Sequence, residues 1–143
     1  MIQSFIIPVK LPSLNEVVAE NRRNCYAGAK LKRDTEETIM TYIFCEQVLK
    51  VEKPCIVHMV FEEGNRKRDV DNVESAKKFI LDALVRARIL QGDSPKYVIG
   101  SPSFTRYTNG ETRVIVTIID DDNPDKLRDV LRSASDQITR GIE

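Results

Sequence analysis

The residues best suited to chemistry lie between Arg66 and Asp93. Two carboxylates, Asp69 and Asp71, stand one residue apart directly after a basic run, and a third, Asp93, follows an amphipathic stretch. Carboxylate oxygens are preferred ligands of Mg²⁺, which usually takes only one or two of them and leaves places for water and substrate phosphate. The spacing therefore predicts a divalent-metal site built by two loops at opposite ends of one helix.

A helix of about five turns is expected after Asn72, between these two loops. Its apolar residues recur at steps of three and four, which is the spacing of one buried stripe: Val73, Ala76, Ile80, Ala83, Leu84 and Ala87. At about 100° per residue, Lys78 falls on the face shared by Asp71 and Asp82. Lys77 lies roughly 120° away from Asp71. We therefore expect Lys78 to reach toward the carboxylates, where a lysine can hold a scissile phosphate or stabilise a leaving oxygen.

Structural roles compete with this interpretation. Asp71, followed three residues later by Glu74, has the spacing of a helix cap with a capping-box partner. Asp93, in Gly-Asp-Ser-Pro, is also typical of a turn. Glu62 and Glu63 end the preceding apolar segment and could either supply a further metal ligand or keep a strand end soluble.

The segment resembles the RusA-like Holliday junction resolvases, small endodeoxyribonucleases of phages and prophages. The family pattern is Arg-x-Arg-Asp-x-Asp-Asn, then a lysine, then Asp-Ala-Leu, then a closing acid before an apolar strand. The matching residues of this chain are Arg66-Lys67-Arg68-Asp69-Val70-Asp71-Asn72, Lys78, Asp82-Ala83-Leu84 and Asp93. An amino-terminal segment is similar to the branch found in phages of Gram-positive bacteria: Leu11-Pro12-Ser13-Leu14-Asn15-Glu16, Arg22-Arg23-Asn24 and Ala29-Lys30.

The chain departs from the family pattern at two positions. Gly92 stands where the family commonly has the first of two closing acids, so Asp93 is alone. The family lysine usually lies four residues after the second aspartate of the motif, a position that Ser75 occupies here. Counting backward from Asp-Ala-Leu selects Lys78 instead, in agreement with the helical spacing.

The resemblance implies a homodimeric, Mg²⁺- or Mn²⁺-dependent endonuclease that resolves four-way DNA junctions by paired nicks. Asp69, Asp71 and Asp93 would hold the metal, and Lys78 would take part in catalysis. The expected DNA contacts are Arg22, Arg23, Lys30, Arg33, Arg66, Arg68 and Asn72. The alternatives are a nuclease for flaps or other branched DNA, and a protein that binds DNA structures without cutting. Three intact acids favour cleavage, because a carboxylate cluster by itself weakens phosphate binding.

Composition is consistent with one cytoplasmic domain. The 143 residues are 41% hydrophobic with no Trp, which is enough for an aliphatic core. Three cysteines at irregular spacing fit neither a zinc site nor a disulfide framework, and no apolar run is long enough to span a membrane. The net charge is zero. Five basic residues fall within 21–33 without an acid, however, and a neutral chain with such local charge can present a basic face to phosphates.

The pattern of elements predicts an α+β fold with a mixed sheet. Strands are expected at 3–9, 55–61, 96–107 and 112–120, the last two joined as a hairpin through Thr108-Asn109-Gly110-Glu111. Helices are expected from Leu14, with an interruption at 24–28, then at 29–50 and after Asn72. Residues 1–123 would form the nuclease domain, and 124–143 would form a helix packed on that domain or on a partner subunit. His58, the sole histidine, is expected to be structural.

Overall fold

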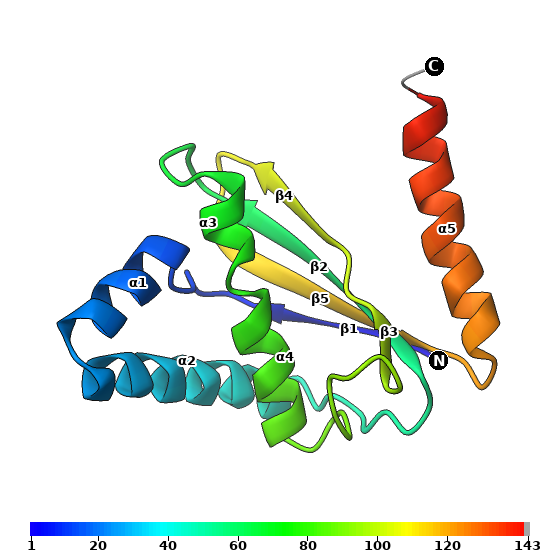
Figure 1. Cartoon of the computed structure of the whole chain (residues 1–143), viewed down its shortest axis with the longest axis horizontal. Helices are drawn as coiled ribbons and strands as arrows, with labels where there is room; N and C mark the ends of the chain where they lie inside the picture. The colour runs from blue at the N-terminus through cyan, green and yellow to red at the C-terminus, as the bar shows by residue number, and fades with distance from the viewer. Residues whose placement is uncertain (142–143) are drawn as a thin grey trace.

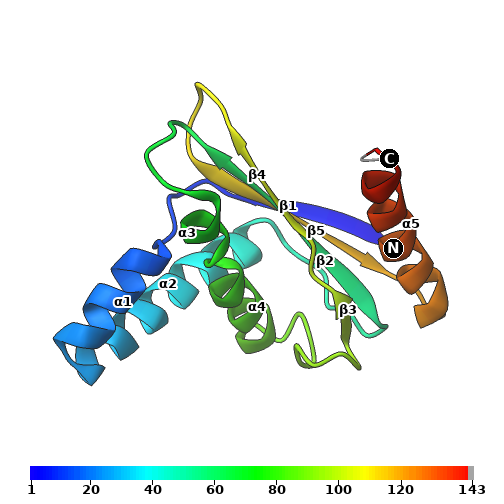
Figure 2. The same ribbon diagram turned by 45° about the horizontal axis from the view of Figure 1, so that its top comes forward.

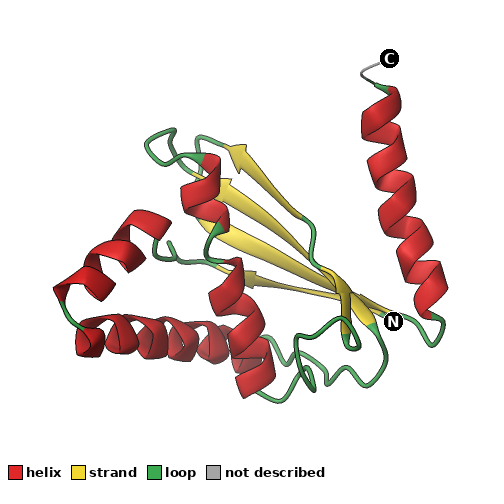
Figure 3. Ribbon diagram, in the orientation of Figure 1, coloured by secondary structure: helices red, strands yellow, loops and turns green. Residues whose placement is uncertain are grey.

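The computed structural model describes residues 1–141 and is a single-domain α+β fold (Figures 1 and 3). A mixed, open sheet is covered by helices on one face. The strands are β1 (Ile2–Ile7), β2 (Cys55–Glu63), β3 (Val98–Gly100), β4 (Ser103–Tyr107) and β5 (Arg113–Asp120). The helices are α1 (Leu14–Arg23), α2 (Cys25–Cys45), α3 (Val70–Glu74), α4 (Lys77–Arg86) and α5 (Pro124–Arg140).

Strand β2 is the centre of the sheet. It pairs antiparallel with β5, which in turn pairs antiparallel with β1, and its other edge pairs in parallel with both β3 and β4. The predicted hairpin is therefore wrong, because β2 lies between β4 and β5. The connection between them crosses the end of β2, where Thr108 N–H donates to the Glu63 carbonyl at 2.7 Å and Gly64 N–H donates to Thr112 Oγ1 at 3.1 Å. A Cβ at Gly64 would lie 2.5 Å from the Gly110 carbonyl oxygen, so glycine permits this close crossing.

Two predicted elements are divided in the structure, and one predicted interruption is shorter than expected. The interruption near residue 24 is a single residue: Asn24 ends α1, and its side chain accepts the Ala27 N–H at 2.7 Å to begin α2. The helix expected after Asn72 is split into α3 and α4, and Ala76 N–H bonds only three residues back, to the Val73 carbonyl. The strand expected at 96–107 is split into β3 and β4 around Pro102.

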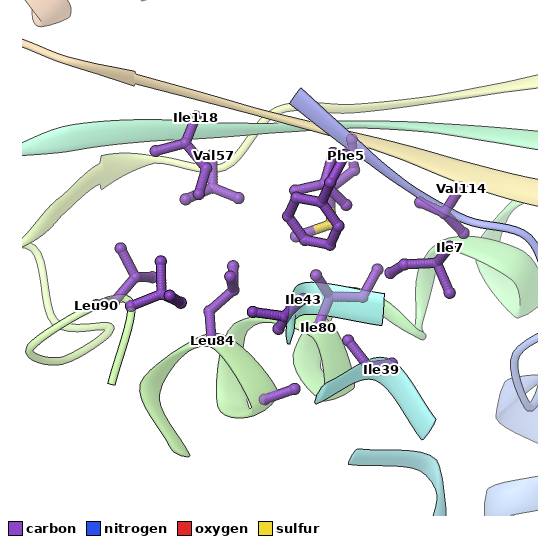
Figure 4. Close-up of a cluster of buried hydrophobic side chains, with 14 of the residues drawn as sticks. Phe5, Ile7, Ile39, Ile43, Val57, Ile80, Leu84, Leu90, Val114 and Ile118 are labelled. Atoms are coloured by element: carbon purple, nitrogen blue, oxygen red, sulfur yellow. The ribbon is translucent and has the colours of Figure 1, made fainter. Parts of the chain in front are cut away.

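The core lies between the sheet and the layer formed by α2 and α4 (Figure 4). Alternate residues of β1, β2 and β5 face these helices, and the buried cluster is almost entirely aliphatic. It includes Phe5, Ile7, Ile39, Ile43, Val57, Ile80, Leu84, Leu90, Val114 and Ile118. This packing fixes α4, and with it α3, relative to the end of β2.

Helix α5 leaves the domain at the end of the sheet opposite α3 and projects away from the sheet (Figures 1 and 2). Among its side chains only Leu127 is buried. Within residues 1–141, none of the helices combines the length and apolar character needed to cross a lipid bilayer.

Candidate metal and DNA-binding site

The loop that carries the Asp69–Asp71 motif is anchored by a buried ion pair. Arg68 donates two hydrogen bonds to the Glu63 carboxylate, from Nε at 2.6 Å and from Nη2 at 3.0 Å. A third donor, Nη1, reaches the Leu11 carbonyl at 2.7 Å, and the Tyr107 hydroxyl donates to the Arg68 carbonyl at 2.8 Å. The Arg68 and Glu63 side chains are only 12% and 5% exposed. Arg68 therefore ties together β2, β4 and the segment before α1, which differs from the expectation that it contacts DNA.

Helix α3 is held from two sides directly after this loop. On one side, the Glu74 carboxylate accepts hydrogen bonds from the hydroxyls of Ser103 and Thr105 on β4, the latter at 2.8 Å. On the other side, Asn72 Oδ1 accepts the backbone N–H of Asn15 at 3.2 Å. Asn72 thus joins α3 to the first turn of α1. These contacts fix the short helix, which by itself would be too short to be stable.

Asp69 and Asp71 are presented to solvent on this anchored turn. Asp69 is the N-cap residue of α3, but its side chain makes no capping hydrogen bond, and Asp71 lies in the first turn. The capping-box alternative for Asp71 is therefore wrong, since Glu74 is engaged with β4. Within residues 1–141, neither aspartate side chain has a hydrogen bond or an ion pair, and both residues are exposed. Two free carboxylates on a rigid turn are suited to binding a hard cation.

Asp93 lies at the other end of the sheet. Tyr97, four residues later, accepts the Cys55 N–H through its carbonyl at 2.9 Å, and Cys55 is the first residue of β2. Asp69 follows the loop anchored on Glu63, the last residue of β2. Eight steps of about 3.3 Å separate these two strand ends by roughly 26 Å. The expectation that all three acids meet at one edge is therefore wrong within a single chain, and no group of three potential metal ligands forms in the described part of the chain.

An acid at position 92 would collide with the Tyr97 ring. A Cβ at Gly92 would lie 2.9 Å from Cδ2 of the Tyr97 ring, which packs against the glycine backbone. Any side chain at this position would have to displace that ring. The loop is also closed by a turn in which the Ser94 carbonyl accepts the N–H groups of Tyr97 and Val98, at 2.9 and 3.0 Å.

Lys78 and Lys77 diverge as the helical spacing predicts. Lys78 Nζ lies 3.3 Å from the Asp82 carboxylate, and its side chain is 75% exposed. Lys77 Nζ instead donates to the Ser101 carbonyl at 2.7 Å in a partly buried position. The break between α3 and α4 interrupts the regular spacing that put Asp71 on the same face, so only the pairing of Lys78 with Asp82 is established.

The basic residues of 21–33 lie on α1 and α2 and not on an irregular arm. Helical spacing also brings acids from just outside this range against them: Arg23 lies 3.7 Å from Glu20, and Lys30 lies 2.9 Å from Asp34. The hydrogen bond and charge of Asp34 raise the pKa of Lys30 above its ordinary value. Arg22 and Arg33 are exposed and make no ion pair within residues 1–141, so they remain the most available cations of this group.

Glu62 and Glu63 are not free ligands. Glu62 is buried on the sheet and accepts Arg113 Nε at 2.6 Å and Arg106 Nη2 at 3.1 Å. The hydrogen bond from Arg113, reinforced by Arg106, holds the pKa of the Glu62 carboxyl below its usual value. Both glutamates therefore have structural roles, and the idea that either supplies a metal ligand is not supported.

Sequence reasoning missed Tyr107, which both bonds to the loop and carries a cation on its ring. Its hydroxyl holds the Arg68 carbonyl, and the Arg66 guanidinium lies 5.2 Å from its ring centroid. Arg66 and Lys67 are exposed beside the two free aspartates. No local sequence signal identifies Tyr107, because it reaches the loop through the parallel pairing of β4 with β2.

A scan against protein-family models finds no match, and neither does a search of curated proteins.

Proposed function

We propose that the chain is a Mg²⁺- or Mn²⁺-dependent endodeoxyribonuclease for branched DNA, similar to the RusA-like resolvases, that acts on four-way junctions as a homodimer. The observation that carries this proposal is how the loop with Asp69 and Asp71 is held in the fold. Arg68 and Asn72 of the motif are hydrogen-bonded within the fold, whereas Asp69 and Asp71 are exposed and make no hydrogen bond or ion pair within residues 1–141. Exposed carboxylates on a turn fixed by a buried ion pair have no evident structural task.

The two aspartates can hold one hard cation with places left for water and phosphate oxygens. A cation held by Asp69 and Asp71 would supply Lewis-acid polarisation of the phosphodiester and charge stabilisation at the departing oxygen. Arg66 and Lys67, exposed beside the aspartates, are placed to bind the flanking phosphates. Arg22 and Arg33 on the helical hairpin α1–α2 would extend this positive surface along the DNA backbone.

Asp93 can join this site only from a second chain. A two-fold axis that sets two sheets antiparallel brings the Cys55 end of one strand β2 beside the Glu63 end of the other. In such a dimer, Asp93 of the partner subunit would complete each metal site, and two equivalent sites would make paired nicks. The proposal therefore ties catalysis to dimerisation.

Cleavage of a synthetic four-way junction tests the proposal directly. Purified protein should nick the junction with Mg²⁺, leave a matched linear duplex intact, and lose activity in EDTA. Asp71→Asn should abolish nicking while preserving junction binding, because removal of negative charge eases the approach of phosphate. A wild-type protein that binds the junction but never nicks it with Mg²⁺ or Mn²⁺ would contradict the proposal.

Mixed dimers test the origin of the third acid. A chain carrying Asp69→Asn and Asp71→Asn is combined with a chain carrying Asp93→Asn, and the proposal expects each to be inactive by itself. If Asp93 acts across the dimer, the mixture regains one intact site and nicks one strand. If mixing restores nothing and Asp93→Asn alone remains active, Asp93 is a turn residue.

The second candidate is a protein that binds branched DNA without cutting it. The placement of Asp93 near the Cys55 end of β2, with Asp69 and Asp71 beyond its Glu63 end, favours this alternative for an isolated chain. Junction binding that persists in EDTA, with no nicking by wild type or by any mixed dimer, is the result it requires.

A further inference from the structure

A pocket of about 250 Å³ opens between α1, α2 and α4, on the helical side of the sheet. Helix α1 packs against α2 and α3, and α2 packs against α4, which brings these walls together (Figures 1 and 2). Ser75 lines the pocket, and its N–H donates to the Asp71 carbonyl at 3.1 Å. One helical turn, about 5.4 Å along the axis, therefore separates this wall of the pocket from Asp71.

The walls of the pocket are largely apolar. Leu14 and Val17 from α1, Leu31 from α2 and Phe79 from α4 line it. Leu14 is 42% exposed, so a large aliphatic side chain stands open to solvent at this place. Phe79 is half-buried and packs against the core, which holds its ring in position. Apolar walls with one fixed aromatic ring suit a flat ligand with apolar faces.

The charged groups of the pocket carry an excess of positive charge. Lys32, Lys78 and Asp82 line it together with the apolar residues. Lys78 Nζ donates to Asp82 Oδ1 at 3.3 Å, and Lys32 Nζ lies 3.7 Å from Asp82 Oδ2. One carboxylate thus serves two ammonium groups, so an anion of the ligand has a cation available to it.

Asp82 itself lacks a full set of partners. Within residues 1–141, its Oδ2 is buried and accepts no hydrogen bond, and a buried acceptor without a donor is costly. The Lys32 and Lys78 side chains beside it are 55% and 75% exposed. Both are long and flexible, so they can turn toward an anion and uncover the carboxylate for a donor on the same ligand.

We propose that this pocket takes one unstacked nucleotide of the DNA strand that passes Asp71, and that the base carries an exocyclic amino group. The base would lie against Phe79, its amino group would donate to Asp82, and Lys32 would hold its phosphate. Adenine, cytosine and guanine carry such an amino group, whereas thymine does not. The identity of the strand as branched DNA rests on the proposed function, and bases that are already unpaired cost least to extrude.

The chemistry of the pocket argues against an apolar peptide or an acyl chain. Either would cover Asp82 and the two lysines without offering them a hydrogen-bonding partner, which is unfavourable. A nucleotide offers a partner to each: phosphate oxygens to the ammonium groups, an amino group to the carboxylate, and ring faces to the apolar walls. The pocket is also smaller than the roughly 300–1,000 Å³ typical of sites for drug-sized ligands, so it suits a single ring system.

Methyl NMR of the full chain in EDTA tests the proposal without a junction or cleavage. Titration with dAMP should shift the methyl signals of Leu14, Val17 and Leu31 and leave those of exposed Val130 on α5 unchanged. Deoxyribose 5-phosphate lacks the base and should not shift the pocket signals. Purine deoxyriboside 5′-monophosphate lacks only the amino group and should bind at least roughly tenfold more weakly than dAMP, because the hydrogen bond to a charged acceptor is lost.

A substitution that fills the pocket provides the second measurement. Val17→Phe should raise the Kd for dAMP at least roughly tenfold, because the larger side chain occupies the space of the base. Ala19→Phe, on an exposed part of α1 outside the pocket, is the matched control and should bind as wild type does. Circular dichroism checks that both variants are folded, and Leu31→Phe replaces Val17→Phe if the latter unfolds.

Three results would overturn the proposal. Equal shifts with deoxyribose 5-phosphate would reduce the site to phosphate binding, and equal affinities for dAMP and its purine analogue would exclude the role of Asp82. Pocket signals that do not move at millimolar dAMP would exclude the base itself. Nicking of a junction without these shifts would refute the nucleotide pocket alone, and the shifts without nicking would refute the nuclease alone.

Discussion

Replacement of Arg68 by alanine separates the anchoring role from a DNA-binding role. The substitution leaves the Glu63 carboxylate, which is 5% exposed, without its two hydrogen bonds, and it removes the donor to the Leu11 carbonyl. Breaking a buried ion pair from one side costs about 3–5 kcal/mol, because the remaining charge is uncompensated. For a domain of this size each kcal/mol lowers the Tm by about 2–4 °C, so we expect a decrease of about 6–20 °C.

The matched control removes both charges. Arg68→Met combined with Glu63→Met leaves only the Leu11 carbonyl without a partner, which costs about 1–3 kcal/mol. Equilibrium urea unfolding of wild type, Arg68→Met, Glu63→Met and the double variant gives the coupling energy of the pair, and Arg68→Ala is measured beside them. The double variant should be more stable than Arg68→Ala.

A different result for Arg68→Ala would assign this residue to DNA binding. If Arg68→Ala changes the unfolding free energy by less than about 1 kcal/mol while the salt dependence of junction binding becomes shallower, Arg68 contacts phosphate and does not anchor the loop.

Lys78→Ala is expected to lower junction turnover at least tenfold, which corresponds to an activation barrier higher by about 1.4 kcal/mol. The unfolding free energy of this variant should change by less than about 0.5 kcal/mol. Lys77→Ala should instead lower stability by about 1 kcal/mol, because it loses the bond to the Ser101 carbonyl, and a turnover defect in Lys77→Ala alone would refute this assignment. Four basic residues are neutralised together: Arg22, Arg23, Lys30 and Arg33. The slope of log K for junction binding against log salt should become shallower by roughly 0.9 per lost phosphate contact, and an unchanged slope would exclude these residues from the DNA interface. The lowered pKa of Glu62 contributes stability above its ordinary value of 4.5 that is lost as pH falls through the lowered folded-state pKa. Glu62→Gln should therefore lose less unfolding free energy than wild type between pH 6 and pH 3, and equal losses would argue against this coupling. Burial, aided by the charge of Asp120, raises the pKa of the Cys55 thiol to about 11, so iodoacetamide at pH 8 should modify Cys25 and Cys45 first, and rapid labelling of Cys55 in the native protein would contradict its burial.

The sequence by itself determined the elements whose signals are local. Helix α1 begins at Leu14 as expected, with Ser13 accepting the Glu16 N–H as its cap. Alternating or continuous apolar residues located β1, β2 and β5 to within two residues. The spacing that separates Lys78 from Lys77 was also sufficient, since both lie within α4. These features depend on residues a few positions apart, and short-range geometry fixes them.

Sequence was not sufficient where a distant segment competes with a local signal. The turn signal at 108–110 predicted a hairpin, but β2 is inserted between the two strands because β4 satisfies its backbone in parallel pairing instead. The helix after Asn72 is divided after Glu74, whose carboxylate is bound by hydroxyls about thirty residues later in the chain. Neither partner could be identified from the motif itself.

In the candidate site, too, the sequence determined some features and the tertiary structure decided others. The sequence identified Asp69 and Asp71, and it identified the basic residues beside them. Only the tertiary structure decided that Arg68 is buried against Glu63 and that Asp93 lies at the far end of β2. A helix of known length between two acids does not by itself say where the following loop lies. That placement depends on which end of the sheet the next strand joins, and β3 joins β2 at Cys55.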